Sequence, residues 1–213
     1  LIERSPLHAW HAHPKLNPHY QREERETLDL GTAAHAYLLQ GSTDFEVIAA
    51  PDWRTTAAKQ AREAARATGK VPILAHRWDE LRAMGLHAWV ALLAQEPPTP
   101  FTKAAGAAEQ TLIWREDEVW CRARLDWLHH DHRTVDDYKT TGGSANPDVW
   151  TRTLFGSGYD VQAAWYLRGV KAVFGTEATF RFVVQENYPP YALSVIALGP
   201  AALMLAEKKV RYA

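Results

Sequence analysis

Two aspartates and one lysine have the residue types and the spacing of a hydrolytic site. Ten residues separate Asp126 from the triplet Asp137-Tyr138-Lys139. Two carboxylates bind a hard divalent cation such as Mg2+, which prefers oxygen ligands and keeps several waters that a substrate can displace. Such a cation activates a bound water and offsets the charge of a phosphodiester, and a nearby ammonium can orient that water. The three residues therefore predict phosphodiester hydrolysis, with a plain surface hairpin held by a salt bridge as the competing interpretation.

Side-chain alternation predicts the two strands that would position these residues. In the first strand one face carries Cys121, Ala123, Leu125 and Trp127, and the other carries Arg122, Arg124 and Asp126. In the second strand Asp137 and Lys139 share a face, because successive side chains of a strand point to opposite sides. A hairpin across the intervening polar turn would bring Asp126 beside Asp137, where the Tyr138 carbonyl could add another oxygen to the cation.

Asp126 with Asp137-Tyr138-Lys139 resembles the PD-(D/E)XK nuclease signature, with Asp in place of the commoner Glu before x-Lys. Other segments resemble, in the same chain order, the exonuclease VIII (RecE-type) group, which is related to the lambda-type phage exonucleases. These segments are S-P-L-H-A-W from Ser5, L-D-L-G-T-A-A-H-A-Y-L-L from Leu28, G-Y-D-V-Q-A-A-W-Y from Gly158 and E-N-Y-P-P-Y from Glu186. Together with the hairpin they cover most of the chain.

The resemblance implies roles for residues outside the hairpin. In this group the histidine of G-T-x-x-H, here His35, is a metal-site residue, and an acidic residue ahead of the core strands, here Glu109, joins the site through the cation or a water. The Q-x-x-x-Y motif would place Gln162 and Tyr166 on the scissile phosphate or the adjoining strand. From the residues alone, a histidine on such a helix face is more often a core side chain than a ligand, Tyr166 could equally be a core side chain, and Glu109 could be a solvated strand end.

Several polar residues near the predicted cation are candidates for DNA contact. The loop that follows the second strand is rich in turn formers and offers hydroxyl groups, although a simple surface loop is an open alternative. Basic residues on the first strand and on the helix of the Q-x-x-x-Y motif could extend a positively charged track. The candidates are Arg124, Thr140, Thr141, Arg168 and Lys171.

A run of metal-ligand types, His129-His130-Asp131-His132, lies in the predicted turn. Zinc sites favour histidine and aspartate. Consecutive residues of a tight turn cannot all converge on one ion, however, and the neighbouring aspartates suit a hard cation better. We therefore expect a solvated turn.

Composition narrows the function classes. The chain has 213 residues, 46% of them hydrophobic, and nine tryptophans, which predicts a packed domain with a sizeable core. Its net charge of -1 gives no global basic field, so a DNA ligand would need a local basic groove.

One cysteine, Cys121, excludes a disulfide framework and an iron-sulfur cluster and is typical of the cytoplasm. No apolar run of about 18 residues predicts a membrane span, and the start at Leu1 leaves open whether residues precede it.

The remaining pattern predicts an α/β fold with a restriction-endonuclease-like (PD-(D/E)XK) core, in which helices flank a mixed central β-sheet. We expect one nuclease domain over 1–213, with a helical N-terminal wall over about 1–100 and a catalytic core over about 105–213. Expected helices cover 1–10, 23–40, 55–68, 79–95, 147–154, 159–174 and a segment from Pro200, and expected strands cover 45–49, 109–114, 179–185 and 191–197. Residues 102–108 are expected as a flexible entry or a short helix.

For function, the resemblance implies an Mg2+- or Mn2+-dependent exonuclease that degrades double-stranded DNA from its ends, 5′ to 3′, in phage or prophage recombination. It also implies a ring-shaped homo-oligomer, a trimer or a tetramer, that works with a single-strand annealing protein. Two alternatives stay open. One is a structure-selective or restriction-type endonuclease with the same core chemistry, and the other is a catalytically silent DNA-binding or assembly module.

Overall fold

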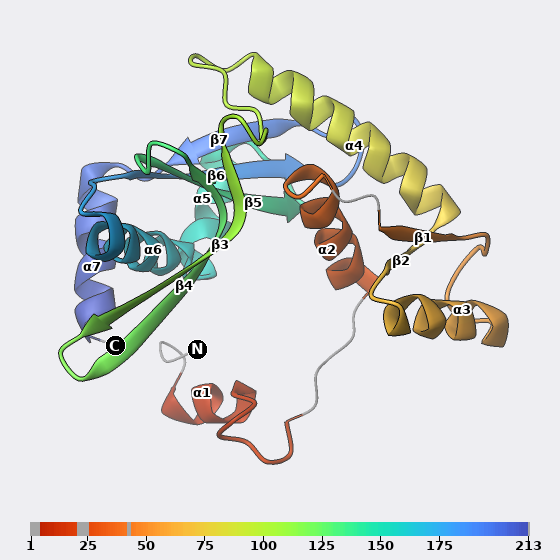
Figure 1. The fold of residues 1–213 in the computed structure, drawn as a ribbon, viewed down its shortest axis with the longest axis horizontal. Coiled ribbons are helices and arrows are strands. Elements are labelled where there is room, and N and C mark those ends of the chain that lie inside the picture. The colour runs from red at the N-terminus through yellow and green to blue at the C-terminus, as the bar shows by residue number, and fades with distance from the viewer. Residues whose placement is uncertain (1–4, 21–25, 42–43, 213) are drawn as a thin grey trace.

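The structure is a computed structural model that describes residues 5–20, 26–41 and 44–212 (Figure 1). Its elements are α1 (Pro6–Ala12), α2 (Glu26–Leu38), β1 (Phe45–Ile48), α3 (Thr56–Ala67), β2 (Val71–Leu74), α4 (Ala75–Leu93), β3 (Gly106–Glu116), β4 (Val119–His129), β5 (Thr134–Thr141), α5 (Pro147–Gly156), α6 (Tyr159–Phe174), β6 (Thr179–Glu186), β7 (Leu193–Ala197) and α7 (Pro200–Tyr212). Among the described helices, none has both the length and the apolar character needed to cross a membrane.

A five-stranded sheet in the order β3-β4-β5-β6-β7 organises the fold. β5 and β6 run parallel, and all the other neighbours run antiparallel. Parallel neighbours need a crossover connection, which α5 and α6 supply between β5 and β6. Helices lie on both faces of the sheet (Figure 1). The predicted mixed sheet flanked by helices is therefore confirmed.

Two apolar clusters attach the helices to the sheet. On one face Leu125 and Phe182 pack with α5 and α6, and α7 lies against α6. On the other face Tyr138 packs with α2 and α4. These two helices pass close together at Gly85, where an added Cβ would lie 2.4 Å from the ring of Tyr37. Glycine at this position therefore permits the close approach of α2 and α4.

Four elements differ from the sequence prediction. α1 covers Pro6–Ala12, whereas a helix was expected over 1–10; residues 1–4 of that helix, and residues 23–25 of the one expected over 23–40, lie outside the described part of the chain. β2 was not expected, because a run of four residues that contains Pro72 is a weak strand signal; it pairs in parallel with β1 in a two-stranded sheet, where both strands are edges. α4 begins at Ala75 instead of residue 79. β3 begins at Gly106, so residues 106–108 pair with β4 and are neither helical nor a free entry segment.

The most consequential difference lies in β4. The alternation predicted that Leu125 and Trp127 share a face, but Leu125 and Leu128 belong to one apolar cluster and Trp127 to the other. The alternation therefore reverses next to Asp126. β4 and β5 pair only at Trp127–Asp136 and Leu128–Val135. The two strands separate beyond this short ladder, and the sheet opens where Asp126 lies.

Candidate active site

Asp137 and Lys139 form the buried side of the site on β5. The Lys139 ammonium makes an ion pair with Asp137 Oδ1, and Gln162 Nε2 on α6 donates to Asp137 Oδ2 at 2.7 Å. Asp137 is almost fully buried. The Lys139 ammonium also lies 5.1 Å from the ring centroid of Tyr159, a cation–π contact. Both oxygens of Asp137 are therefore occupied by its own protein neighbours.

Asp126 faces the same lysine from β4, where the strands separate. Its Oδ2 accepts a hydrogen bond of 2.9 Å from the backbone N–H of Tyr138. This bond replaces a regular ladder pair and ties the carboxylate of one strand to the backbone of the next. His35 Nδ1 on α2 lies 3.7 Å from the same oxygen. The helix and both strands therefore meet at Asp126.

Asp126 and Asp137 share one ammonium, that of Lys139, and burial and these charges together shift the pKa values of all three groups. Burial and then the charge of Asp137 raise the pKa of Asp126 to about 7. Burial also raises the pKa of Asp137, against the opposing effect of Lys139. Burial alone would lower the pKa of Lys139, but the two aspartates outweigh it and raise that pKa. A cation would relieve the excess negative charge.

Glu109 occupies an irregular position in β3. Its neighbours Ala108 and Gln110 pair with β4, but Glu109 and Asp126 do not pair with each other. Its φ of 56° is uncommon for a residue other than glycine, and such conformations concentrate at functional sites. The carboxylate makes an ion pair with Arg124, and Gln40 Nε2 donates to it at 3.4 Å.

His35, Glu109 and Asp126 form the group that could hold a metal ion. One ligand atom from each lies within 4.8 Å of the others. Burial and the charge of Lys139 lower the pKa of His35, which favours the neutral imidazole that a metal needs. One nitrogen and two carboxylates leave room for waters, so the donor set fits a divalent cation. Asp137 is not part of this group, and its role as a ligand stays a prediction.

The candidate residues surround an open cavity of about 790 Å³. It is lined by Gly31, His35, Glu109, Arg124, Asp126, Tyr138, Lys139, Thr140, Gly142, Tyr166 and Asn187. Most of the predicted residues are therefore brought together. Gln162 and Asp137 lie behind Lys139, bonded to each other. Thr141 is not among the lining residues; its backbone oxygen accepts a bond of 2.9 Å from the N–H of Asn187.

Asn187 is a cavity residue that the sequence did not single out, because E-N-Y-P-P-Y was used only as part of the family resemblance. Its position follows from the sheet: Thr141 pairs with Glu186 in parallel register, so the residues after β5 and β6 meet at one edge. Glu186 supports the adjoining loop, since its Oε1 accepts a 2.9 Å bond from the N–H of Ala145. The sequence signal that could have identified Asn187 is the position of E-N-Y-P-P-Y directly after an expected strand.

Tyr166 combines the two roles that the sequence left open. It lines the cavity, and its ring also packs edge-on against Phe180 with centroids 5.8 Å apart. Burial raises the pKa of its hydroxyl, which stays a hydrogen-bond donor at neutral pH.

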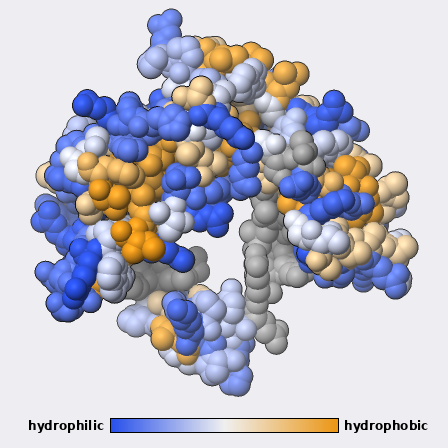
Figure 2. All heavy atoms as spheres, viewed as in Figure 1, coloured by the Kyte–Doolittle hydropathy of each residue, from blue (hydrophilic) through white to orange (hydrophobic). Residues whose placement is uncertain are grey.

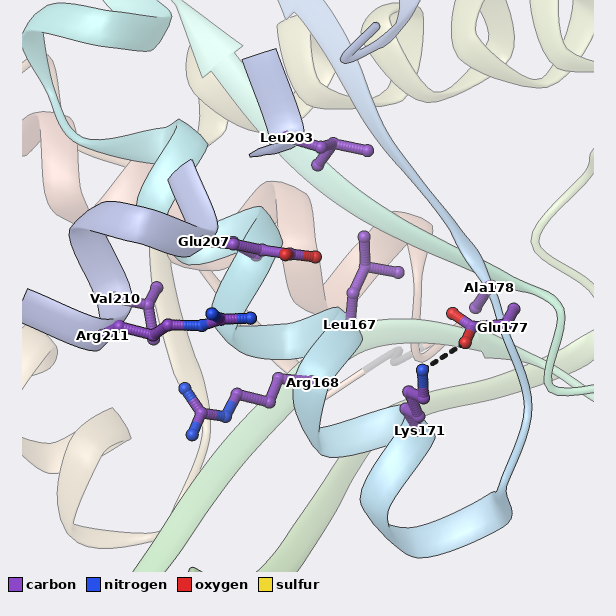
Figure 3. Close-up of a pocket in the computed structure, with 10 residues that line it drawn as sticks. Leu167, Arg168, Lys171, Glu177, Ala178, Leu203, Glu207, Val210 and Arg211 are labelled. Atoms are coloured by element: carbon purple, nitrogen blue, oxygen red, sulfur yellow. Dashed lines mark ion pairs between the residues drawn. The ribbon is translucent and has the colours of Figure 1, made fainter. Parts of the chain in front are cut away.

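The expected basic track along α6 is wrong. Arg168 makes an ion pair with Glu116, and Lys171 makes one with Glu177. Both cations line a different pocket, between α6 and α7, where the labelled side chains of α6 and α7 face one another (Figure 3). Residues 162 and 166 face the site from another side of the same helix, so the basic residues do not continue from them.

The histidines of the β4–β5 turn have separate partners. His129 Nε2 lies 2.7 Å from Asp136 Oδ2, His130 Nε2 lies 2.9 Å from the Lys103 carbonyl oxygen, and His132 stacks on Phe174. Among the described residues they form no metal-binding group. His129 is partly buried, so the turn is less solvated than expected.

A mixed sheet that separates between an aspartate on one strand and D-x-K on the next defines a PD-(D/E)XK fold. The chain belongs to the family described as "PDDEXK-like domain of unknown function (DUF3799)", which it matches over residues 7–213. The superfamily resemblance is thereby confirmed, whereas the RecE-type group stays a prediction.

A solved structure shares the fold: the crystal structure at 2.19 Å resolution of a "putative exonuclease" from Eubacterium rectale. The TM-score is 0.60 at 14% sequence identity, and the match covers 93% of this chain and 68% of that one. The comparison with curated proteins finds no match. The family and the fold together support a nuclease as the class of function.

Proposed function

We propose that this chain is an Mg2+- or Mn2+-dependent deoxyribonuclease that hydrolyses double-stranded DNA from its ends. The observation that carries the proposal is the buried excess of negative charge at Asp126 and Asp137, which share Lys139 beside the group formed with His35 and Glu109. Such an arrangement attracts a cation and places an ammonium next to it. The 5′ to 3′ polarity comes from the RecE-type resemblance alone.

Each residue has a distinct task in this proposal. When bound, the cation would supply an activated water and offset charge on the phosphodiester. Asp126, His35 and Glu109 would hold it, and the predicted ligand roles of Asp137 and the Tyr138 carbonyl belong to the same proposal. Asp137 also holds the ammonium of Lys139 in place, where it would orient the attacking water. Gln162 in turn fixes Asp137 through its 2.7 Å hydrogen bond.

Substrate contacts come from the rim of the same cavity. Arg124, Thr140 and Tyr166 line it together with the candidate ligands, and a cation, a hydroxyl and a phenol can each donate to phosphate oxygens. Thr141 contributes through the loop that its backbone fixes to Asn187. Arg124 would exchange its ion pair with Glu109 for a phosphate contact.

The test is digestion of linear duplex DNA labelled at either the 5′ or the 3′ end, beside closed circular DNA, with Mg2+ and with Mn2+. We expect early release of the 5′ label and intact circles, and no activity from Asp137→Ala. Cut circles would identify the endonuclease instead. Binding without cleavage under every condition would identify the silent module, and early 3′ release would reverse the polarity.

The proposed setting is phage or prophage recombination, with a ring-shaped trimer or tetramer and an annealing protein as partner. A ring would explain how an end-dependent enzyme stays on one duplex through many cleavage steps. Sedimentation equilibrium checks it: a monomer with strictly distributive cleavage would remove this part of the proposal and leave the hydrolytic site intact.

A further inference from the structure

The outer face of the β3–β4 hairpin is an exposed surface of mixed aromatic and basic character. It consists of Thr111, Ile113 and Arg115 from β3 and Trp120, Arg122 and Arg124 from β4, all of them exposed. The antiparallel register sets the two rows side by side, with Arg115 opposite Trp120 and Ile113 opposite Arg122. We call this surface the hairpin platform.

Two properties of the hairpin platform indicate that it binds a ligand. Trp120 is 72% exposed and Ile113 60% exposed, which is unusual for such large apolar side chains in adjacent rows. The platform also carries three arginines and no carboxylate. Arg115 is paired with Glu118 at its tip and Arg124 with Glu109 at its base, whereas the Arg122 guanidinium has no ion pair or hydrogen bond within the described part of the chain.

The platform is also braced from behind. The inner face of the hairpin packs on α6, with the ring centroids of Trp114 and Trp165 4.9 Å apart. Trp165 Nε1 donates to the Arg122 carbonyl oxygen at 3.1 Å. At Gly169 an added Cβ would lie 2.8 Å from the Trp114 ring, so glycine permits this close approach. A fixed surface loses little entropy when it binds a ligand.

The platform continues directly into the candidate active site. Trp120, Arg122 and Arg124 alternate along β4 toward Asp126, and Arg124 lines the cavity together with Asp126. The cavity lies between α2 and the hairpin, because His35 of α2 lines it together with Glu109 and Arg124. In the space-filling view an open space separates the main body of the molecule from α1 (Figure 2). A polymer with one phosphate at Asp126 would therefore pass over the platform as it leaves.

We infer that the hairpin platform binds a single-stranded segment of the DNA substrate next to the scissile phosphate. The arginines contact successive phosphates, and Trp120 stacks on a base. A basic surface with an aromatic platform is the chemistry by which proteins bind single strands without sequence preference. The inference rests on the proposed function only for the identity of the substrate.

Strand geometry gives the length of the bound segment. The six residue steps from Trp120 to Asp126 span about 20 Å at about 3.4 Å per step. Stacked nucleotides rise about 3.4 Å each, so the segment between the scissile phosphate and Trp120 holds about six nucleotides. Affinity should therefore increase with oligonucleotide length up to about six nucleotides and then level off.

The experiment measures fluorescence anisotropy of labelled single-stranded oligonucleotides of about 4 to about 12 nucleotides, with Ca2+ in place of Mg2+ and gels to verify that the DNA stays intact. We expect Trp120→Ala to lower the affinity for the longer oligonucleotides about 10-fold and to reduce the gain with length, with the remaining gain due to the arginines. Trp120→Phe should keep most of the affinity, because it retains a ring for stacking.

Charge is tested separately from stacking. Arg122→Ala should reduce the slope of log affinity against log salt by about 0.7, the value for one lost single-strand phosphate contact. Matched controls are Trp89→Ala on α4 and Lys59→Ala on α3, both exposed and away from the hairpin. Neither control should change the affinity or the slope.

The outcomes separate this inference from the proposed nuclease. A wild type that cleaves DNA while Trp120→Ala and Arg122→Ala bind like wild type overturns the platform and leaves the nuclease intact. A wild type that needs both residues for binding but cleaves nothing with Mg2+ or Mn2+ supports the platform and refutes the nuclease. Variants that change the sedimentation of the protein but not its DNA affinity would show a contact between copies and overturn the inference.

Discussion

Two adjacent aspartates of β5, Asp136 and Asp137, are both buried and lie on opposite faces of the sheet. Asp136 accepts bonds of 2.6 and 2.8 Å from Arg181, and His129 lies 2.7 Å from it. Asp137 has Gln162 and Lys139, but it shares that lysine with Asp126. One carboxylate has its own guanidinium and the other has part of an ammonium.

The difference indicates which buried charge serves the fold and which serves chemistry. A buried carboxylate needs a partner for its charge, and Arg181 supplies it through a two-pronged contact. On the other face burial raises the pKa of both Asp126 and Asp137, and the charge of Asp137 adds to the rise at Asp126. The negative charge of Asp126 and Asp137 exceeds the positive charge of Lys139, and this excess can be neutralised by a bound cation.

The largest expected effect is on catalysis and concerns Lys139. Lys139→Ala should lower the rate of DNA hydrolysis at least about 1,000-fold, because it removes the group that orients the water. The fold should survive, since the aspartates that lose their counter-ion can take up a proton. Initial rates on labelled duplex and circular dichroism check this, with Lys59→Ala on α3 as the control. Retained activity in Lys139→Ala would contradict the assignment.

The second expected effect is on stability and concerns the opposite face. Arg181→Met should lower the free energy of unfolding by about 3 kcal/mol, because it leaves Asp136 as an uncompensated buried charge. Activity of the folded protein should stay within a few-fold of wild type. Urea denaturation measures it, and the exposed Arg152→Met is the control. If Arg181→Met abolished hydrolysis without a loss of stability, the assignment of Asp136 to stability and of Asp137 to catalysis would be wrong.

A third prediction concerns pH. Asp126 has a pKa of about 7 in the folded protein and about 3.9 when unfolded. The stability that its bound proton contributes is fully present below about pH 4 and is lost as the pH rises through about 7. Metal-free wild type should therefore lose stability relative to Asp126→Asn by about 1 kcal/mol per pH unit between about pH 5 and about pH 7.

Urea denaturation of both proteins in chelator at several pH values measures this difference. Divalent metal should bind wild type more tightly as the pH rises over the same range, because a ligand must be deprotonated. A constant stability difference from acid to neutral pH would show that Asp126 is already ionised in the metal-free fold. The contrast with the fully paired Asp136 would then be weaker than proposed.

The sequence was informative where local periodicity decides the structure. Alternation placed Asp137 and Lys139 on one face of β5, and they form an ion pair there. It also placed Arg122 and Arg124 on one face of β4, opposite Cys121 and Ala123, and both arginines are exposed there. The helices and strands of the core followed from the same patterns.

Alternation failed where the strands become irregular. At Asp126 the face reverses, and at Glu109 the backbone has a positive φ; neither departure leaves a signal in the order of apolar and polar residues. Asn187 was missed for another reason, since only the parallel register of β5 and β6 brings it to the cavity. Glu109 and His35 were found through resemblance and not through periodicity.

The smallest expected effect concerns Tyr138, which touches both regions of the comparison. Its backbone N–H serves Asp126, while its hydroxyl donates to Gln185 Oε1 at 2.7 Å in the core. Gln185 Nε2 in turn donates to the carbonyl oxygen of Met84 at 2.9 Å. Tyr138→Phe should therefore cost about 1 kcal/mol of stability through the buried oxygen left without a donor.

Hydrolysis by Tyr138→Phe should stay near the wild-type rate, because the backbone bond to Asp126 remains. Urea denaturation and initial rates on the same preparation measure the two effects, with Tyr212→Phe, 96% exposed at the end of α7, as the control. A large loss of rate with unchanged stability would mean that the hydroxyl acts on the site through the strand. If the rate is unchanged, the backbone of β5 connects the face that carries Asp136 to the candidate active site, and the side chain of Tyr138 does not.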